Sequence, residues 1–283
     1  MCPVARDAAF VQDAYPDLQP RQLIVTLYGL YAREEHNWLS VAALVRLMGE
    51  LGVDGQAVRS SVSRLKRRGM LRSLAVARAA GYSLSPAALE VLREGDARIF
   101  HSRRAVLADG WVVVVFSVPE SERERRHELR TRLSRLGFGT VAPGVWVAPA
   151  HLAEETAEVL ARSELERYVE MFRGDHLGFT DLTVKVREWW DLDELGAQSA
   201  EFTARFRPVA DRLAVRPASD AEAFRQYVPM LTTWRRLPYL DPGLPLELLP
   251  GGWSGEAATA LFAELNGALR EPARRHAMAV LHA

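Results

Sequence analysis

The stretch that decides the fold is residues 40–84, SVAALVRLMGELGVDGQAVRSSVSRLKRRGMLRSLAVARAAGYSL. Its first part predicts a helix that Ser40 caps and Gly52 ends, because serine accepts hydrogen bonds from free N–H groups and glycine adopts the left-handed conformation at helix ends. Asp54 is the expected N-cap of a second helix, which Gly69 ends. Two short strands, 70–76 and 81–84, follow. This order of elements predicts a winged helix-turn-helix.

The second helix of this stretch has one apolar face and one basic face. At about 100° per residue, Val58, Val62 and Leu65 lie together. Small polar and basic side chains lie opposite them or on the flanks, where they could reach base edges and phosphates. The residues expected to bind DNA are Gln56, Arg59, Ser60, Ser63, Arg64, Lys66, Arg67 and Arg68, together with Arg72 and Arg78 on the connection between the two strands of the wing. The alternative is that the basic run is only a solvated helix face.

The charge distribution favours DNA binding, although the 283-residue chain has a net charge of +0. Residues 21–80 contain ten Lys/Arg and only four Asp/Glu. The rest of the chain is therefore acidic, which is the pattern expected when one module meets phosphate and the remainder avoids it. We expect double-stranded operator DNA as a partner.

The chain before and after this stretch is expected to form further domains. Residues 1–20 are expected to be irregular, and 21–100 to form the DNA-binding domain with a first helix over 21–33. A linker at 101–110 leads to a domain at 111–180 with the order β-α-β-β-α-β, the split ferredoxin-like motif. Residues 181–283 are expected to be α-helical. The expected class is thus α+β.

The C-terminal region is expected to contain four helices and one irregular segment. Trp189 and Trp190 are expected to open a helix that runs to about residue 213, and Asp220 to cap another that reaches Trp234. Residues 238–252 contain four prolines and are expected to form ordered turns. Separate helices are predicted at 255–269 and from Pro272 onward, because proline usually interrupts a helix.

Several classes of protein and site find little support in the sequence. One cysteine, Cys2, cannot form an intramolecular disulfide, and the longest apolar run is far shorter than the roughly 20 residues of a membrane span. No secretory signal is apparent, so a cytoplasmic protein without a membrane partner is expected. The seven histidines show no metal-binding spacing. Neither a catalytic residue nor a cofactor is expected.

Three segments together resemble the PaaX family of phenylacetic-acid-degradation repressors. The N-terminal segments are RQLIVTLYGLYAR (21–33), LGVDGQAVRSSVSRLKRRGML (51–71) and GYSLS (81–85). The middle ones are WVVVVFSVPE (111–120) and LGFGTVAPGVWVAP (136–149). The C-terminal pattern is Asp241-Pro242, Leu244-Pro245, Leu248-Leu249-Pro250 and Trp253. The resemblance implies a homodimeric repressor that an acyl-CoA effector, phenylacetyl-CoA or a related thioester, releases from DNA.

A CoA thioester needs cations for its phosphates, an aromatic face for adenine and an apolar slot for its acyl group. The residues that could supply these are Arg225, Trp234, Arg235, Arg236, Tyr239 and Trp253. The alternative is that residues 234–255 form a rigid clamp in which the tryptophans are buried and Asp241 caps a turn.

Two other functions stay open. The first is a constitutive DNA-binding protein whose C-terminal domain only dimerises it. The second is an enzyme that acts on nucleic acid or on a CoA thioester, such as a ferredoxin-fold nuclease. Such a nuclease carries an acidic metal ligand in its first strand, whereas the first strand expected here, 111–118, contains none.

Overall fold

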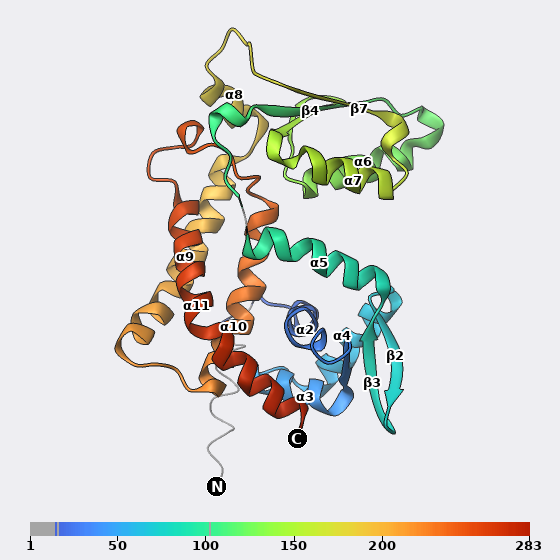
Figure 1. The fold of residues 1–283 in the computed structure, drawn as a ribbon, viewed down its shortest axis with the longest axis vertical. Coiled ribbons are helices and arrows are strands. Elements are labelled where there is room, and N and C mark those ends of the chain that lie inside the picture. The colour runs from blue at the N-terminus through green and yellow to red at the C-terminus, as the bar shows by residue number, and fades with distance from the viewer. Residues whose placement is uncertain (1–14, 16, 102) are drawn as a thin grey trace. The chain divides into compact units, whose positions relative to one another are not determined.

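The computed structural model describes residues 15, 17–101 and 103–283, and the fold is shown in Figure 1. The chain divides into two compact units. Unit 1 comprises residues 1–97, 202–235 and 259–283, and unit 2 comprises 98–201 and 236–258. The predicted irregular segment 1–20 and Cys2 lie almost entirely outside the described residues. The two units do not follow the predicted order of consecutive domains, because the C-terminal helical region contributes residues to both units.

The N-terminal part of unit 1 contains the predicted helices and hairpin. Its elements are α2 (Pro20–Leu27), a π-helical turn (Tyr28–Ala32), β1 (Trp38–Ser40), α3 (Val41–Glu50), α4 (Gly55–Arg67), β2 (Leu71–Val76), β3 (Ala79–Leu84) and α5 (Pro86–Phe100). The helix predicted over 21–33 is therefore α2 together with the π-helical turn. The strand β1 was not predicted.

The caps of α3 and α4 are confirmed. The Ser40 hydroxyl accepts a hydrogen bond from the Ala43 N–H at 3.1 Å, and Asp54 Oδ1 accepts from the Gln56 and Ala57 N–H groups at 2.8 and 2.9 Å. Gly52 and Gly69 follow the two helices with φ of 75° and 71°, in the left-handed region where glycine is favoured. Local sequence signals thus set both ends of each helix.

The three strands form an antiparallel sheet in the order β1-β3-β2. The β2–β3 hairpin turns through Ala77 and Arg78, whose φ values are 48° and 69°. A two-residue turn with both φ positive follows the right-handed twist of the strands, although asparagine and glycine are the usual residues there. The hairpin pairs six residues of each strand, from Leu71↔Leu84 to Val76↔Ala79.

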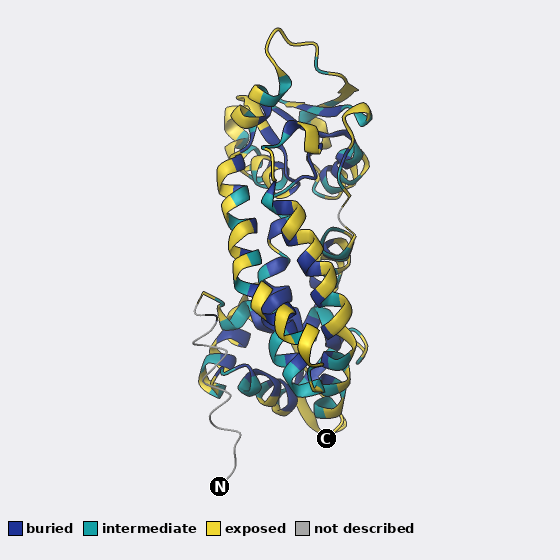
Figure 2. Ribbon diagram, turned by 90° about the vertical axis from the view of Figure 1, so that its left-hand side faces the viewer, coloured by how far each residue is buried: buried dark blue, intermediate teal, exposed yellow. Residues whose placement is uncertain are grey.

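Unit 1 is completed by C-terminal helices. They are the later part of α9 (Leu192–Val215), α10 (Asp220–Trp234) and the later part of α11 (Ser254–Leu281). In α10, Phe224, Tyr227 and Val228 are fully buried. Figure 2 shows buried residues, in dark blue, on the inner sides of the helices and exposed residues, in yellow, on their outer sides.

Three predictions about the C-terminal helices are wrong. Trp189 ends a separate helix, α8 (Leu182–Trp189), and the extended backbone of Trp190 precedes α9, so these tryptophans do not open a long helix. Ser219, rather than Asp220, is the N-cap of α10. The predicted break at Pro272 is absent, because α11 continues through it. Burial of Leu269, Ala273 and Ala277, each 0% exposed, offsets the hydrogen bond that proline cannot donate.

Unit 2 has the predicted β-α-β-β-α-β order. Its elements are β4 (Trp111–Phe116), α6 (Arg123–Arg135), β5 (Gly139–Ala142), β6 (Val145–Pro149), α7 (Ala153–Arg162) and β7 (Val169–Gly174). The antiparallel sheet has the order β5-β6-β4-β7. The two β-α-β crossovers are β4-α6-β5 and β6-α7-β7, and in each of them the two strands are separated in the sheet by one other strand. This is the arrangement of a ferredoxin-like domain. One face of the sheet packs on Leu129 and Leu133 of α6 and Leu160 of α7.

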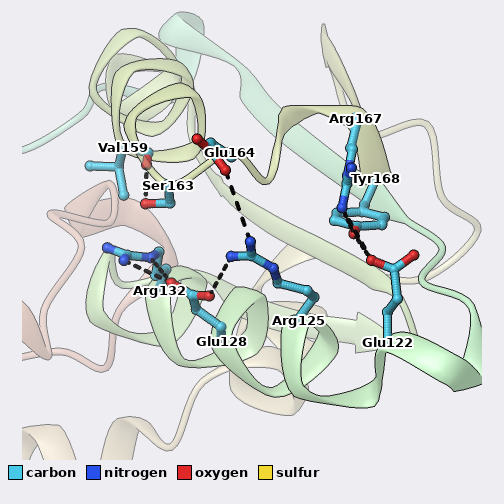
Figure 3. A network of polar contacts seen from close by, with 9 residues as sticks. All are labelled: Glu122, Arg125, Glu128, Arg132, Val159, Ser163, Glu164, Arg167 and Tyr168. Carbon is cyan, nitrogen blue, oxygen red and sulfur yellow. Dashed lines mark hydrogen bonds and ion pairs between the residues drawn. The ribbon is translucent and has the colours of Figure 1, made fainter.

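A network of polar contacts involves residues of α6 and residues just after α7 in unit 2 (Figure 3). Glu128 receives hydrogen bonds from Arg125 at 3.2 Å and Arg132 at 2.9 Å, and these bonds lower the pKa of its carboxyl group. Glu122 accepts hydrogen bonds from Arg167 and Tyr168. The dense charge of α6 is therefore partly neutralised within the unit, as a solvated charged helix requires.

The other face of this sheet packs on α8 and on the turn-rich segment. Trp111 and Val147 contact a cluster that includes Trp190, Leu244 and Trp253. Within the turns, Asp241 Oδ1 accepts a hydrogen bond from the Gly243 N–H at 2.9 Å, while Oδ2 accepts one from Arg104. Residues 238–252 are thus ordered, as predicted, and Asp241 caps a turn.

Candidate nucleic-acid interface

The helix α4 turns its apolar face inward and its polar face to solvent. Val58, Val62 and Leu65 are 2–3% exposed. The eight residues of the helix and its C-cap that were expected to bind DNA are all exposed: Gln56, Arg59, Ser60, Ser63, Arg64, Lys66, Arg67 and Arg68. A surface of this kind presents hydrogen-bonding groups and cations together.

The cations of this surface have no acidic partner among the described residues. They are Arg59, Arg64, Lys66, Arg67, Arg68, Arg72 and Arg78, and none forms an ion pair within 4.0 Å in that part of the chain. Elsewhere many arginines are neutralised, as Arg33 is by Asp96 at 2.5 Å and Arg98 by Glu155 at 2.9 Å. Acceptors supplied by another molecule would therefore meet cations that are available to bind.

Two of these cations have weak contacts within the unit. The Lys66 ammonium lies 5.7 Å from the centre of the Tyr82 ring, in a cation–π contact that joins α4 to β3. A nitrogen of the Arg64 guanidinium lies 3.5 Å from the Ser61 hydroxyl. Both contacts leave most of each cationic group open to solvent.

The hairpin carries the two remaining predicted residues in different places. Arg78 lies in the two-residue turn, as expected, whereas Arg72 lies within β2 and not on the connection. The observed strand, Leu71–Val76, begins one residue after the start of the predicted strand 70–76 and contains Arg72, while Leu71 is buried and pairs with Leu84. Both arginines are exposed. Arg78 is therefore the cation at the tip and Arg72 the cation at the base.

Sequence reasoning missed one group at this interface, the indole of Trp38. Its Nε1–H donates a hydrogen bond to the Leu74 carbonyl at 2.9 Å, and its ring covers Gly81. A strand of three residues gives too short an alternation to be recognised. The only local signal was a tryptophan placed two residues before the cap of α3.

The predicted ligand residues do not form one cluster within a single unit. Arg225, Trp234 and Arg235 belong to unit 1, whereas Arg236, Tyr239 and Trp253 belong to unit 2. Trp234 is 3% exposed, and its ring stacks on that of Phe262 at 4.3 Å between centroids. Its face is thus already covered by the core of unit 1. Arg235 donates a hydrogen bond to the Gln22 carbonyl at 3.2 Å, which joins α10 to α2.

The ligand residues of unit 2 also have structural contacts. Trp253 is 7% exposed within the apolar cluster, although its buried N–H has no hydrogen-bond partner among the residues that the structure describes. The Arg98 guanidinium lies 5.5 Å from the centre of the Tyr239 ring. Arg236 is exposed, and Arg225 of unit 1 is half-buried. The burial of Trp234 and Trp253 and the cap by Asp241 agree with the alternative of a structural clamp.

A surface cavity of about 560 Å³ lies in unit 1, where α9 ends and α10 begins. Its apolar and neutral lining includes Val209, Leu213 and Gln226, and its charged lining residues are Asp211, Arg212, Arg216 and Glu222. None of the six predicted ligand residues lines it. Two bonds from Arg216 and a capping bond from Ser219 lower the pKa of Glu222 to about 2.

Three family models match successive parts of the chain. They are described as PaaX-like protein over residues 19–88, PaaX protein central Cas2-like domain over 104–186, and PaaX-like protein C-terminal domain over 190–279. The chain belongs to the PaaX family. The match places the exposed helix α4 in the N-terminal part of the PaaX architecture and the ferredoxin-like sheet in its central part.

Two individual proteins resemble this PaaX-family chain. The transcriptional repressor PaaX of Escherichia coli (strain K12) is 28% identical over 246 residues, which are 84% of this chain and 77% of the relative. The uncharacterized protein Rv0674 from Mycobacterium tuberculosis has a similar structure, with a TM-score of 0.57 and 21% identity over 90% of this chain and 97% of the other. The second likeness concerns the fold.

The Cas2-like central part of this PaaX-family protein has no carboxylate in β4, whose sequence is WVVVVF. Among residues 15, 17–101 and 103–283, no group of three or more His, Cys, Asp or Glu side chains could hold a metal ion. In the same part of the chain, no helix has the length and apolar character needed to cross a membrane.

Proposed function

We propose that this protein is a sequence-specific DNA-binding transcriptional repressor, in which α2–α4 and the β2–β3 hairpin act as a winged helix-turn-helix. The observation that carries the proposal is the outer face of α4, where exposed cations have no acidic partner among the described residues. In this proposal α4 enters the major groove, with Gln56, Ser60 and Ser63 near base edges. The arginines contact bases or phosphates, and Arg78 contacts the backbone beside the groove.

The similarity to the E. coli repressor supports repression as the outcome of DNA binding. We infer that the target is an aromatic, phenylacetate-type catabolic operon and that the protein acts in the cytoplasm as a homodimer. Two copies of α4 would then lie about 34 Å apart, or a multiple of this, on a near-palindromic operator. Sedimentation of the protein with and without a single operator fragment tests the stoichiometry. A monomer on one half-site would overturn the dimer.

Gel shifts on the DNA beside the protein's own gene test the DNA-binding assignment. The variant R64Q/R67Q is expected to bind this DNA more weakly, and the slope of log K against log salt should fall by about 0.9 for each lost phosphate contact. The control variant R93Q/R207Q removes the same charge from exposed positions in unit 1 outside α4. Equal loss in both variants, or no loss in R64Q/R67Q, would contradict the assignment of α4.

We propose further that an acyl-CoA thioester such as phenylacetyl-CoA releases the protein from DNA. In unit 2, the exposed Arg236 and the partly buried Tyr239 are a cation and an aromatic ring of the kinds that the phosphates and the adenine of CoA require. Release requires that the thioester bind the DNA-incompetent arrangement more tightly, since equal affinity for both arrangements shifts nothing. A bound effector at 100 times its Kd also stabilises the protein by about 2.7 kcal/mol.

A panel of CoA thioesters separates this proposal from constitutive DNA binding. Phenylacetyl-CoA is expected to raise Tm and to abolish the gel shift, whereas free CoA should do neither. The variant R236Q should require more thioester for release, with R187Q as the control for an exposed arginine elsewhere in unit 2. A shift that no thioester changes would favour the constitutive regulator. Loss of RNA or acyl-CoA in the same incubations would instead indicate an enzyme.

A further inference from the structure

In the described part of the chain, no third strand pairs with the outer part of the β2–β3 hairpin. The short strand β1 pairs only with Gly81, Tyr82 and Ser83 of β3. Beyond the pair Leu74↔Gly81, the pairs Ala75↔Ala80 and Val76↔Ala79 and the turn with Arg78 form a two-stranded ribbon. Two-stranded ribbons twist strongly and are marginally stable in isolation. The direction of the tip therefore depends on the contacts made at the pair Leu74↔Gly81, the last pair of the hairpin that β1 still accompanies.

Trp38 holds that pair through both of its members. The indole Nε1–H donates to the Leu74 carbonyl on β2 at 2.9 Å, and the ring lies over Gly81 on β3. A Cβ at position 81 would lie 2.3–2.4 Å from three indole atoms, which is closer than real atoms approach. The absence of a side chain at Gly81 is thus what allows the ring to lie against the hairpin.

The same tryptophan is joined to the helices of the DNA-binding segment. Trp38 begins β1, and Ser40, two residues later, caps α3. The base of the hairpin has its own contacts, because the Tyr28 hydroxyl donates to the Tyr82 carbonyl at 3.1 Å and Lys66 lies over the Tyr82 ring. The hairpin is therefore held at its base by the π-helical turn that follows α2 and by α4, and farther out by Trp38.

We propose that Trp38 is a positioning residue that fixes the direction of the β2–β3 hairpin, so that Arg78 reaches a DNA phosphate. Gly81 is its necessary partner. This inference rests on the proposed function, because it concerns how the wing of a DNA-binding protein is aimed. It assigns Trp38 no contact with DNA, since the indole already covers Gly81 and its N–H is occupied by Leu74.

A double-mutant cycle between Trp38→Ala and Arg78→Gln tests the inference on a promoter fragment that extends beyond the wing. In the wild-type background, R78Q should lower the slope of log K against log salt by about 0.9, the value for one phosphate contact. In the W38A background, R78Q should lower the slope by less than half as much, because the tip no longer reaches that phosphate. The cycle thus measures how strongly the phosphate contact of Arg78 depends on Trp38. A tryptophan that only stabilised the fold would not change the effect of R78Q.

The outcomes distinguish the inference from the proposed function. Equal effects of R78Q in both backgrounds, or no effect of R78Q on wild-type protein, would overturn the role of Trp38 while DNA binding stands. Failure of the wild-type protein to bind the promoter would overturn both. If W38A does not fold, W38F replaces it, since phenylalanine keeps a ring over Gly81 but cannot donate to Leu74. A full effect of R78Q in W38F would then contradict the inference.

Gly81→Ala provides an independent check. Its Cβ should displace the Trp38 ring, so G81A alone should weaken promoter binding and lower the effect of R78Q on the salt slope. In the W38A background the clash is absent, and G81A should then change neither Tm nor binding further. If adding G81A to W38A lowered Tm, Gly81 would be required for a reason other than its contact with Trp38.

Discussion

The side-chain oxygens of Thr26 in α2 and Thr232 in α10 lie 2.8 Å apart, and both residues are buried. This shared hydrogen bond joins the first helix of the proposed DNA-binding segment to a helix more than two hundred residues later in the chain. The bond from Arg235 to the Gln22 carbonyl lies on the same pair of helices. The C-terminal helix α10 is therefore part of the core that supports the elements proposed to bind DNA.

Replacement of either threonine alone should destabilise the protein. Thr232→Val or Thr26→Val removes the shared bond and leaves the other hydroxyl only its bond to the carbonyl of Gln22 or Val228, four residues earlier. Loss of the shared bond should cost about 1 kcal/mol of unfolding free energy. The double variant T26V/T232V should be nearly neutral, because two apolar groups of the same shape then meet. Chemical denaturation measures all four proteins. Additive losses in the double variant would show that the two hydroxyls do not interact.

The cap of α4 should contribute measurably to stability. Asp54→Ala removes the acceptor for the Gln56 and Ala57 N–H groups and should lower the unfolding free energy by about 1 kcal/mol. Asp54→Ser is the matched control, since serine caps without a charge and should restore most of this loss. Denaturation curves of D54A and D54S compare the two. Equal losses would assign the effect to the charge and not to the cap.

The turn of the β2–β3 hairpin should be improved by asparagine. Ala77 has a φ of 48°, a region that costs an alanine about 1 kcal/mol and that asparagine tolerates better. We expect A77N to raise Tm, whereas Ala80→Asn, at an exposed strand position with ordinary φ, should not. Differential scanning calorimetry compares the variants. A lower Tm in A77N would contradict the assignment of the turn.

The half-buried His151 should make unit 2 sensitive to mild acid. Burial lowers the pKa of its imidazole, and the positive charge of Arg103 lowers it further. Protonation then favours the unfolded chain, so the stabilisation from a neutral His151 is complete above about pH 6.5 and decreases as pH falls through that value. We expect the Tm of the wild-type protein to fall between about pH 7.5 and 5.5 and that of H151N to fall less. Parallel decreases would assign the acid sensitivity to other groups.

The sequence was most informative where structure is set locally. Asp54, the spacing of Val58, Val62 and Leu65, and Gly69 define α4 without help from distant residues. The exposure of the arginines on its outer face follows from the same spacing. The strand β1 could not be recognised in this way, because it exists only through its pairing with β3 and the contact of Trp38 with Gly81.

Long-range packing explains the predictions that were wrong or incomplete. A proline at position 272 predicts a break, but buried residues on either side of it hold α11 together. The ligand prediction faced a similar difficulty, since neither composition nor spacing distinguishes a tryptophan buried against Phe262 from one that offers its face to a nucleotide. Which arginines are neutralised also depends on partners distant in the chain, as with Arg104 and Asp241.

The assembly of unit 1 from residues 1–97, 202–235 and 259–283 has a consequence for biosynthesis. The ribosome makes α2–α4 long before it makes α10, whose Thr232 shares a hydrogen bond with the buried Thr26. Contacts so distant in sequence form late and slow the folding of the unit. Until these contacts form, the basic helix α4 of a nascent chain lies on a core that still lacks residues 202–235 and 259–283. The protein should therefore acquire its stable DNA-binding form only after translation has passed the last turns of α11.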